Sequence, residues 1–165
     1  MNRDKVYLVG FMGAGKTTVA RALGRRLGWR VEDIDERIEA RERRTVAAIF
    51  SQHGEPYFRQ LERQALVELL PERHVIVATG GGTFVEADNR ALMLADGATV
   101  WLDVPLAQVL RRVPTDGRRP LAADRTRMEQ LFFTRQLSYA NAHVRIDGTM
   151  PVPEVVDRVL EWIGY

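Results

Sequence analysis

The chain has 165 residues, of which 45% are hydrophobic and 28% charged, as is ordinary for one soluble globular domain. It contains no cysteine, which excludes disulfides, a thiolate metal site and a cysteine nucleophile. The formal net charge is only +2, so nucleic-acid binding is not expected, and no apolar stretch approaches the roughly 20 residues of a membrane span. We expect one cytoplasmic domain over residues 1–165.

Short apolar runs alternate with longer amphipathic segments, which predicts an α/β fold with a five-stranded parallel sheet. Strands are expected at about 6–9, 29–32, 74–79, 98–102 and 144–146. Helices are expected at about 15–28, 35–70 (two or three helices, with a break at 54–56), 86–95, 105–112, 125–141 and 152–163. Residues 113–124 contain two prolines, one glycine and little apolar content, and this composition predicts a loop.

A glycine-rich segment follows the first predicted strand. Its sequence, G-F-M-G-A-G-K-T at 10–17, matches the P-loop pattern G-x-x-x-x-G-K-[ST] in full. The glycines let successive N–H groups turn toward one anion, and the helix that follows adds its positive end. A lysine at position 16 places a charge on the β- and γ-phosphates, and a hydroxyl at position 17 can ligate Mg²⁺. The motif predicts that ATP or GTP is bound with Mg²⁺ by Gly13, Ala14, Gly15, Lys16, Thr17 and Thr18.

Two other classes of P-loop protein fit the sequence poorly. GTPase switches read guanine with an N-K-x-D segment, which cannot exist here because the only lysines are Lys5 and Lys16. ATPase motors carry an acidic residue at the end of an apolar strand, as Asp103 does here, but the chain is too short for motor machinery. Asp103 is therefore interpreted either as a carboxylate linked to magnesium or as the cap of the next helix.

Three further features are expected of a small kinase. Asp33 and Asp35 end the second predicted strand and face the same way if the extended conformation persists, one toward hydrated Mg²⁺ and one toward a substrate hydroxyl. A helix cap plus a surface charge is the alternative. The triplet Gly80–Gly82 offers backbone N–H groups at a strand end, although a plain loop fits equally. Arg118 and Arg119 either close over the phosphates or belong to a solvated basic loop.

These motifs together resemble the shikimate kinase family, over essentially the whole chain. They are G-F-M-G-A-G-K-T-T at 10–18, D-I-D-E-R-I-E at 33–39, G-E-P-Y-F-R-Q-L-E at 54–62, T-G-G-G at 79–82, W-L-D-V-P at 101–105, R-P-L at 119–121 and R-x-x-x-Y at 135–139. The resemblance implies a three-layer α/β/α P-loop kinase fold. It also implies phosphorylation of the 3-hydroxyl of shikimate by ATP, in the route to chorismate and the aromatic amino acids.

The resemblance also implies which residues bind the acceptor. Asp35 binds a ring hydroxyl and acts as the base, while Arg59 and Arg135 hold the carboxylate, for which a guanidinium fork is well suited. Gly81 offers a backbone contact within the triplet Gly80–Gly82. The substrate-binding helices are expected at about 34–70.

On the nucleotide side, the resemblance places Arg112 on adenine and Arg119 on the ATP phosphates, in a lid loop at about 113–124. Thr17 and Asp33 are the expected magnesium residues. ATP and shikimate are the expected partners of a monomer, without nucleic acid or membrane. A related kinase similar to gluconate kinase and a catalytically silent nucleotide-binding module remain as alternatives.

Overall fold

Five parallel strands form the sheet of the computed structural model, which describes residues 1–112 and 125–165. The strands lie in the order β2-β3-β1-β4-β5. Their bounds are β1 Lys5–Val9, β2 Arg30–Asp33, β3 Val75–Ala78, β4 Ala98–Asp103 and β5 Val144–Asp147. The five-stranded parallel sheet expected from the sequence is confirmed.

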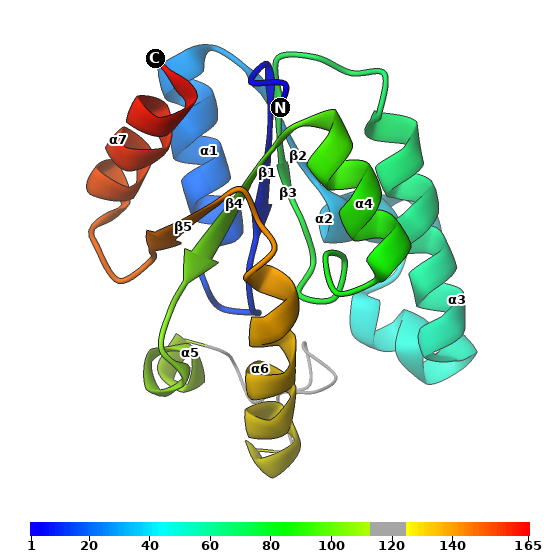
Figure 1. Cartoon of the computed structure of the whole chain (residues 1–165). Helices are drawn as coiled ribbons and strands as arrows, with labels where there is room; N and C mark the ends of the chain where they lie inside the picture. Colours follow the sequence, from blue (N-terminus) through cyan, green and yellow to red (C-terminus); the bar gives the residue numbers. More distant parts are fainter. Residues whose placement is uncertain (113–124) are drawn as a thin grey trace.

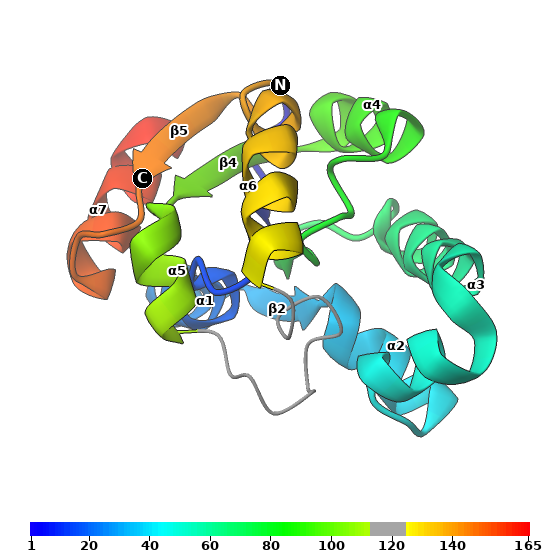
Figure 2. The same cartoon turned by 90° about the horizontal axis from the view of Figure 1, so that it is seen from below.

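Helices cover both faces of the sheet and complete a three-layer α/β/α arrangement. The views agree that α1 and α7 lie on one face while α3 and α4 lie on the other (Figures 1 and 2). No helix within the two described segments is long and apolar enough to cross a membrane. The helix bounds are α1 Lys16–Leu27, α2 Ile34–Glu42, α3 Val46–Leu69, α4 Ala87–Asp96, α5 Leu106–Arg112, α6 Arg125–Tyr139 and α7 Val152–Ile163.

The central strands are largely apolar, as suits strands covered on both faces. All four residues from Val6 to Val9 are fully buried, and β3 is buried along its whole length. Strand β1 pairs with β3 on one side and β4 on the other, with Leu8 opposite Ala78 and Val100. Such continuous apolar runs are typical of parallel strands enclosed between helix layers.

The order of the strands places a ligand crevice at the carboxyl ends of β1 and β3. These strands are neighbours, and the helices that follow them, α1 and α4, lie on opposite faces of the sheet. Ligands of open α/β sheets bind at such a switch point. The carboxyl ends of the strands face the viewer in Figure 2, while the chain termini lie at the opposite end of the sheet in Figure 1.

In the α2–α3 region, the structure departs from one expectation from the sequence and confirms another. Strand β2 ends at Asp33 and α2 begins at the next residue, so Asp35 lies in a helical first turn. The condition that extended backbone persists to Asp35 is therefore not met, and the alternative, a helix cap, is formed by Asp33. The predicted helix break is confirmed, because Gly54 has φ 81° and ψ 172° within α3 and Pro56 follows it. The predicted lid at 113–124 lies outside the described residues.

A buried polar cluster closes the amino end of the sheet. Lys5 is fully buried, and its ammonium donates to the carbonyls of Leu69 and Leu70 at 2.7 and 3.0 Å. It also donates to Asp96 at 2.7 Å, and Asp96 accepts the Tyr7 hydroxyl at 2.5 Å. The cluster therefore fixes the ends of α3 and α4 to β1, because each of its buried charges is paired and hydrogen-bonded.

Candidate active site

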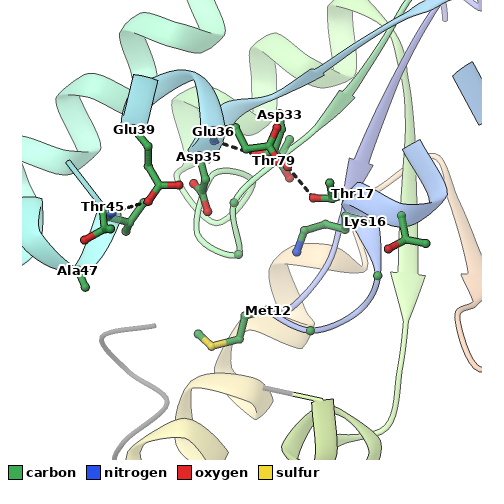
Figure 3. A pocket seen from close by; sticks show the side chains of 16 residues that line it. Met12, Lys16, Thr17, Asp33, Asp35, Glu36, Glu39, Thr45, Ala47 and Thr79 are labelled. Carbon is green, nitrogen blue, oxygen red and sulfur yellow. Dashed lines mark hydrogen bonds between the residues drawn. The ribbon is translucent and has the colours of Figure 1, made fainter. Parts of the chain in front are cut away.

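One cavity of about 630 Å³ opens at the carboxyl ends of the strands. The P-loop forms one side of it, and residues of α2, the N-terminus of α3 and the loop after β3 form the other sides. Figure 3 shows Lys16 directed into this space, with Thr17 hydrogen-bonded to Asp33 beside it and Asp35 nearby on the same side as Asp33. The cavity therefore joins the predicted nucleotide residues to part of the predicted acceptor site.

The P-loop turns where its glycines adopt conformations that L side chains rarely allow. Gly13 and Gly15 have φ values of 77° and 94°, in the left-handed region. Lys16 is buried, and its ammonium donates to the carbonyls of Gly10 and Phe11 at 2.5 and 2.9 Å. The lysine charge is thereby held over the loop that the motif assigns to phosphates.

Arg112 extends from the end of α5 to the opposite rim of this loop. Its guanidinium donates to the Gly13 carbonyl at 3.3 Å, and the side chain stays exposed. Arg112 is not among the described residues that line the cavity. Ala14, within the P-loop, is buried and does not line the cavity either. Arg119 lies outside the described residues, so its assignment to the phosphates stays a prediction.

Asp33 combines the two interpretations that the sequence left open. One carboxylate oxygen accepts the Thr17 hydroxyl at 2.5 Å, and the other accepts the backbone N–H of Glu36 at 3.0 Å. The second bond caps α2 and fixes the carboxylate beside the P-loop. These two hard oxygen groups suit Mg²⁺, which prefers oxygen ligands, retains several waters and needs few side chains.

Asp35 meets the glycine triplet inside the same cavity. A Cβ at Gly80 would come within 2.8 Å of the Asp35 carboxylate and 3.2 Å of the Glu62 carboxylate. Any side chain at position 80 would therefore displace one of the two acids. Glycine at position 80 thus leaves room for the Asp35 carboxylate, and the two segments contribute to one site.

Arg59 is held by a buried carboxylate, Glu62, which lies in the motif at 54–62 but received no role from the sequence. Glu62 is fully buried; it accepts from Arg59 at 2.9 Å and from the Thr83 hydroxyl at 2.8 Å. Burial alone would lower the pKa of Arg59, but Glu62 and Glu55 more than offset it and raise that pKa. The spacing of Glu62, three residues after Arg59 on a helix, is the signal that could have identified it. Thr83 carried no such signal.

Arg135 approaches the triplet from the opposite side, on α6. It is 6% exposed, and a Cβ at Gly81 would come within 3.1 Å of its guanidinium. One helical turn later, the Tyr139 hydroxyl donates to the Gly81 carbonyl at 2.5 Å. Burial raises the pKa of Tyr139 well above its usual value, so the phenol stays neutral. The Arg–x–x–x–Tyr spacing thus places both side chains on one face of α6.

Two predicted residues have surroundings different from those expected. Gly82 is buried outside the cavity lining, where a side chain would overlap the guanidinium of Arg59. The Asp103 carboxylate accepts from Arg145 at 2.8 Å, and the Asp103 side chain is 19% exposed. Neither a helix cap nor a contact with Thr17 is formed by Asp103 among the described residues.

The comparisons with known proteins agree along nearly the whole chain. The family model described as shikimate kinase matches residues 12–164. The chain belongs to the shikimate kinase family. It is 40% identical to shikimate kinase from Persephonella marina over 94% of this chain and 96% of the relative. With the enzyme from Thermosynechococcus vestitus the identity is 44%, over 94% and 87%.

Solved structures give the same assignment. Shikimate kinase from Acinetobacter baumannii in complex with shikimate superposes with a TM-score of 0.93 at 34% identity, covering 98% of this chain and 93% of that one. A sugar kinase from Janibacter, at 16% identity and a TM-score of 0.63, shares the fold alone. This shikimate kinase is thus an ATP-dependent phosphotransferase of aromatic amino acid biosynthesis, with a P-loop kinase fold.

Proposed function

We propose that ATP binds along the P-loop and that shikimate binds between Asp35 and the glycine triplet. The observation that supports this division is a shared cavity, lined by Lys16 and Thr17 on one side and by Asp35, Gly80 and Gly81 on another. A shared cavity brings the γ-phosphate to the acceptor hydroxyl, and such positioning supplies much of the catalysis in phosphoryl transfer. Arg112, beside the P-loop, is assigned to the adenine end.

The acceptor carboxylate is assigned to Arg59 and Arg135. Their guanidinium groups approach the glycine triplet from two different helices, α3 and α6. A planar guanidinium can donate two parallel hydrogen bonds to a carboxylate, which fixes the orientation of the ring as well as its charge. With the carboxylate held there, the backbone of Gly81 is available to a ring hydroxyl.

Asp35 is assigned the proton of the 3-hydroxyl. That hydroxyl oxygen forms a bond to the γ-phosphorus while the bond from phosphorus to the leaving oxygen of ADP breaks, and the proton passes to the carboxylate. Lys16 offsets the negative charge on the transferring group. Arg119 is assigned to the same phosphates from the family resemblance alone.

Thr17 and Asp33 would hold Mg²⁺, the expected cofactor. Among the described residues no group of three or more histidine, cysteine, aspartate or glutamate side chains could hold a metal. When bound, the ion neutralises phosphate charge.

We further propose that the enzyme works as a cytoplasmic monomer on ATP and shikimate, without nucleic acid or membrane. All assigned residues come from one chain, and the net charge of +2 offers no strong field for a polyanion. Light scattering of the purified enzyme tests the monomer.

An acceptor panel separates this function from its alternatives. ADP release is measured with ATP and Mg²⁺ in the presence of shikimate, gluconate or no acceptor. We expect release that depends on shikimate. Dependence on gluconate would indicate the related sugar kinase, and no dependence on either acceptor would indicate a silent nucleotide-binding module.

A further inference from the structure

Glu39 lines the cavity but has no part in the roles assigned above. It lies on α2, one helical turn after Asp35, and Figure 3 shows both side chains directed into the same space. Its carboxylate accepts the backbone N–H of Val46 at 2.9 Å, across the corner between α2 and α3. The acid that precedes the corner therefore binds the first residue of the next helix.

This bond holds the wall of the cavity opposite the P-loop. Thr45, Val46 and Ala47 line the cavity where α3 begins. The first N–H groups of a helix have no partner within it, and a nearby carboxylate stabilises them. Glu39 satisfies Val46, while the Thr45 hydroxyl accepts from Ala48 at 3.1 Å. Two side chains thus determine where this wall lies, and one of them is anchored on the helix that carries Asp35.

We propose that Glu39 is a positioning residue that sets the spacing between Asp35 and the wall at Thr45–Ala47, and thereby the affinity for shikimate. The inference rests on the proposed placement of shikimate against Asp35. Without the bond, α3 can begin further from α2, and the acceptor half of the cavity widens. The P-loop half is built from other elements and is unaffected.

Two variants of Glu39 separate positioning from a direct effect of its charge. Glu39→Ala removes the acceptor for Val46, and loss of a helix cap of this kind corresponds to roughly a 3- to 30-fold change. We expect KM for shikimate to rise by about that factor, with kcat within about threefold of wild type and KM for ATP unchanged. Glu39→Gln keeps an oxygen for the same N–H and should restore KM to within about threefold.

Glu42→Ala is the matched control. Glu42 also joins α2 to α3, because it accepts the Tyr57 hydroxyl at 3.0 Å, but it is not among the cavity-lining residues. Its removal loosens the same pair of helices without moving the wall of the cavity. We expect KM for shikimate to stay at the wild-type value in this variant.

Val46→Pro removes the same hydrogen bond from the donor side. Proline is favourable at the first position of a helix, and Thr45 has φ −69° and ψ 157°, which suit a residue before proline. KM should rise in this variant too, and adding Glu39→Ala should raise it no further, because the bond is already lost. This second route also serves if Glu39→Ala fails to fold.

Three results would overturn the inference: an unchanged KM in Glu39→Ala, a Glu39→Gln variant as impaired as Glu39→Ala, or fully additive effects in the double variant. An equal rise in KM for Glu42→Ala would overturn it too, because Glu39 would then only contribute to the general stability of the α2–α3 pair. Failure of the proposed function is distinguishable, because Asp35→Asn would then retain wild-type turnover whatever Glu39 does.

Discussion

Two arginines, Arg59 and Arg135, are assigned to the acceptor carboxylate. Their replacement should affect the stability of the free enzyme differently. Arg59 is neutralised within the protein by Glu62 at 2.9 Å and Glu55 at 3.2 Å. Arg135 is 6% exposed, and within the described residues it has no carboxylate partner; it interacts with the Tyr139 hydroxyl and lies over the Phe11 ring at 5.9 Å. Among the described residues, the charge of Arg59 is thus paired within the fold, whereas that of Arg135 faces no carboxylate.

Replacement of each arginine by methionine keeps most of the apolar stem and removes the charge. Arg59→Met leaves Glu62 fully buried without its cation, which costs about 3 kcal/mol, the low end for a broken buried pair. For a chain of this length that lowers Tm by roughly 6–12 °C. Arg135→Met strands no buried carboxylate among the described residues, so it should cost at most about 1.5 kcal/mol, the value of its hydrogen bond with Tyr139.

Shikimate affinity should fall in both variants, by about 2–4 kcal/mol, the range for loss of one partner of a desolvated charge pair. Thermal unfolding without ligands measures the first effect, and titration of shikimate and of ATP against each variant measures the second. Destabilisation of the free enzyme by Arg135→Met, equal to that by Arg59→Met, would refute the distinction. Equal losses of ATP and shikimate affinity would refute the assignment of both residues to the acceptor.

Three other predictions concern single residues. Lys16→Ala should lower kcat by several orders of magnitude without unfolding the protein, since it removes charge stabilisation of the transferring group; near-normal turnover of the folded variant would contradict the P-loop assignment. Lys5→Met should cost about 1–3 kcal/mol in a denaturant titration, because the Leu69 and Leu70 carbonyls lose their donor while Asp96 keeps Arg73 at 3.0 Å; no measurable loss would show that the cluster contributes little. The His143 ring accepts the N–H of Thr99, and burial lowers the pKa of this ring. The contribution of neutral His143 to the free energy of unfolding should therefore be complete above about pH 6.5, and it should decline as the pH falls toward the lowered pKa. His143→Gln should flatten that decline between pH 7.5 and 5.5, and an unchanged slope would exclude His143 as its source.

The parts of the fold and site that could be predicted from sequence are those encoded locally. The P-loop is contiguous, so its glycines, Lys16 and Thr17 identify themselves by spacing. The kink at Gly54 was equally visible, because glycine and proline stand two residues apart in an amphipathic segment. Parallel strands covered on both faces gave continuous apolar runs.

Contacts between distant segments had no such signal. Lys5 and Asp96 are 91 residues apart, and a lysine at the start of a strand suggests solvent rather than a buried ion pair. The junction at Asp33 was left open between an extended pair and a helix cap, because only tertiary contact shows that Asp33 both ends β2 and caps α2. The Glu62–Thr83 hydrogen bond, which ties α3 to the glycine triplet, likewise depends on tertiary packing.

Transfer of a labelled γ-phosphate tests the central claim most directly. Wild type and Asp35→Asn are incubated with labelled ATP, Mg²⁺ and shikimate, and the product is identified by NMR. We expect the label on the 3-hydroxyl of shikimate, formed by wild type and slowed about 10²- to 10⁴-fold in Asp35→Asn, the range for loss of a general base. Label on another hydroxyl, or transfer by Asp35→Asn at the wild-type rate, would contradict the placement of the acceptor against Asp35.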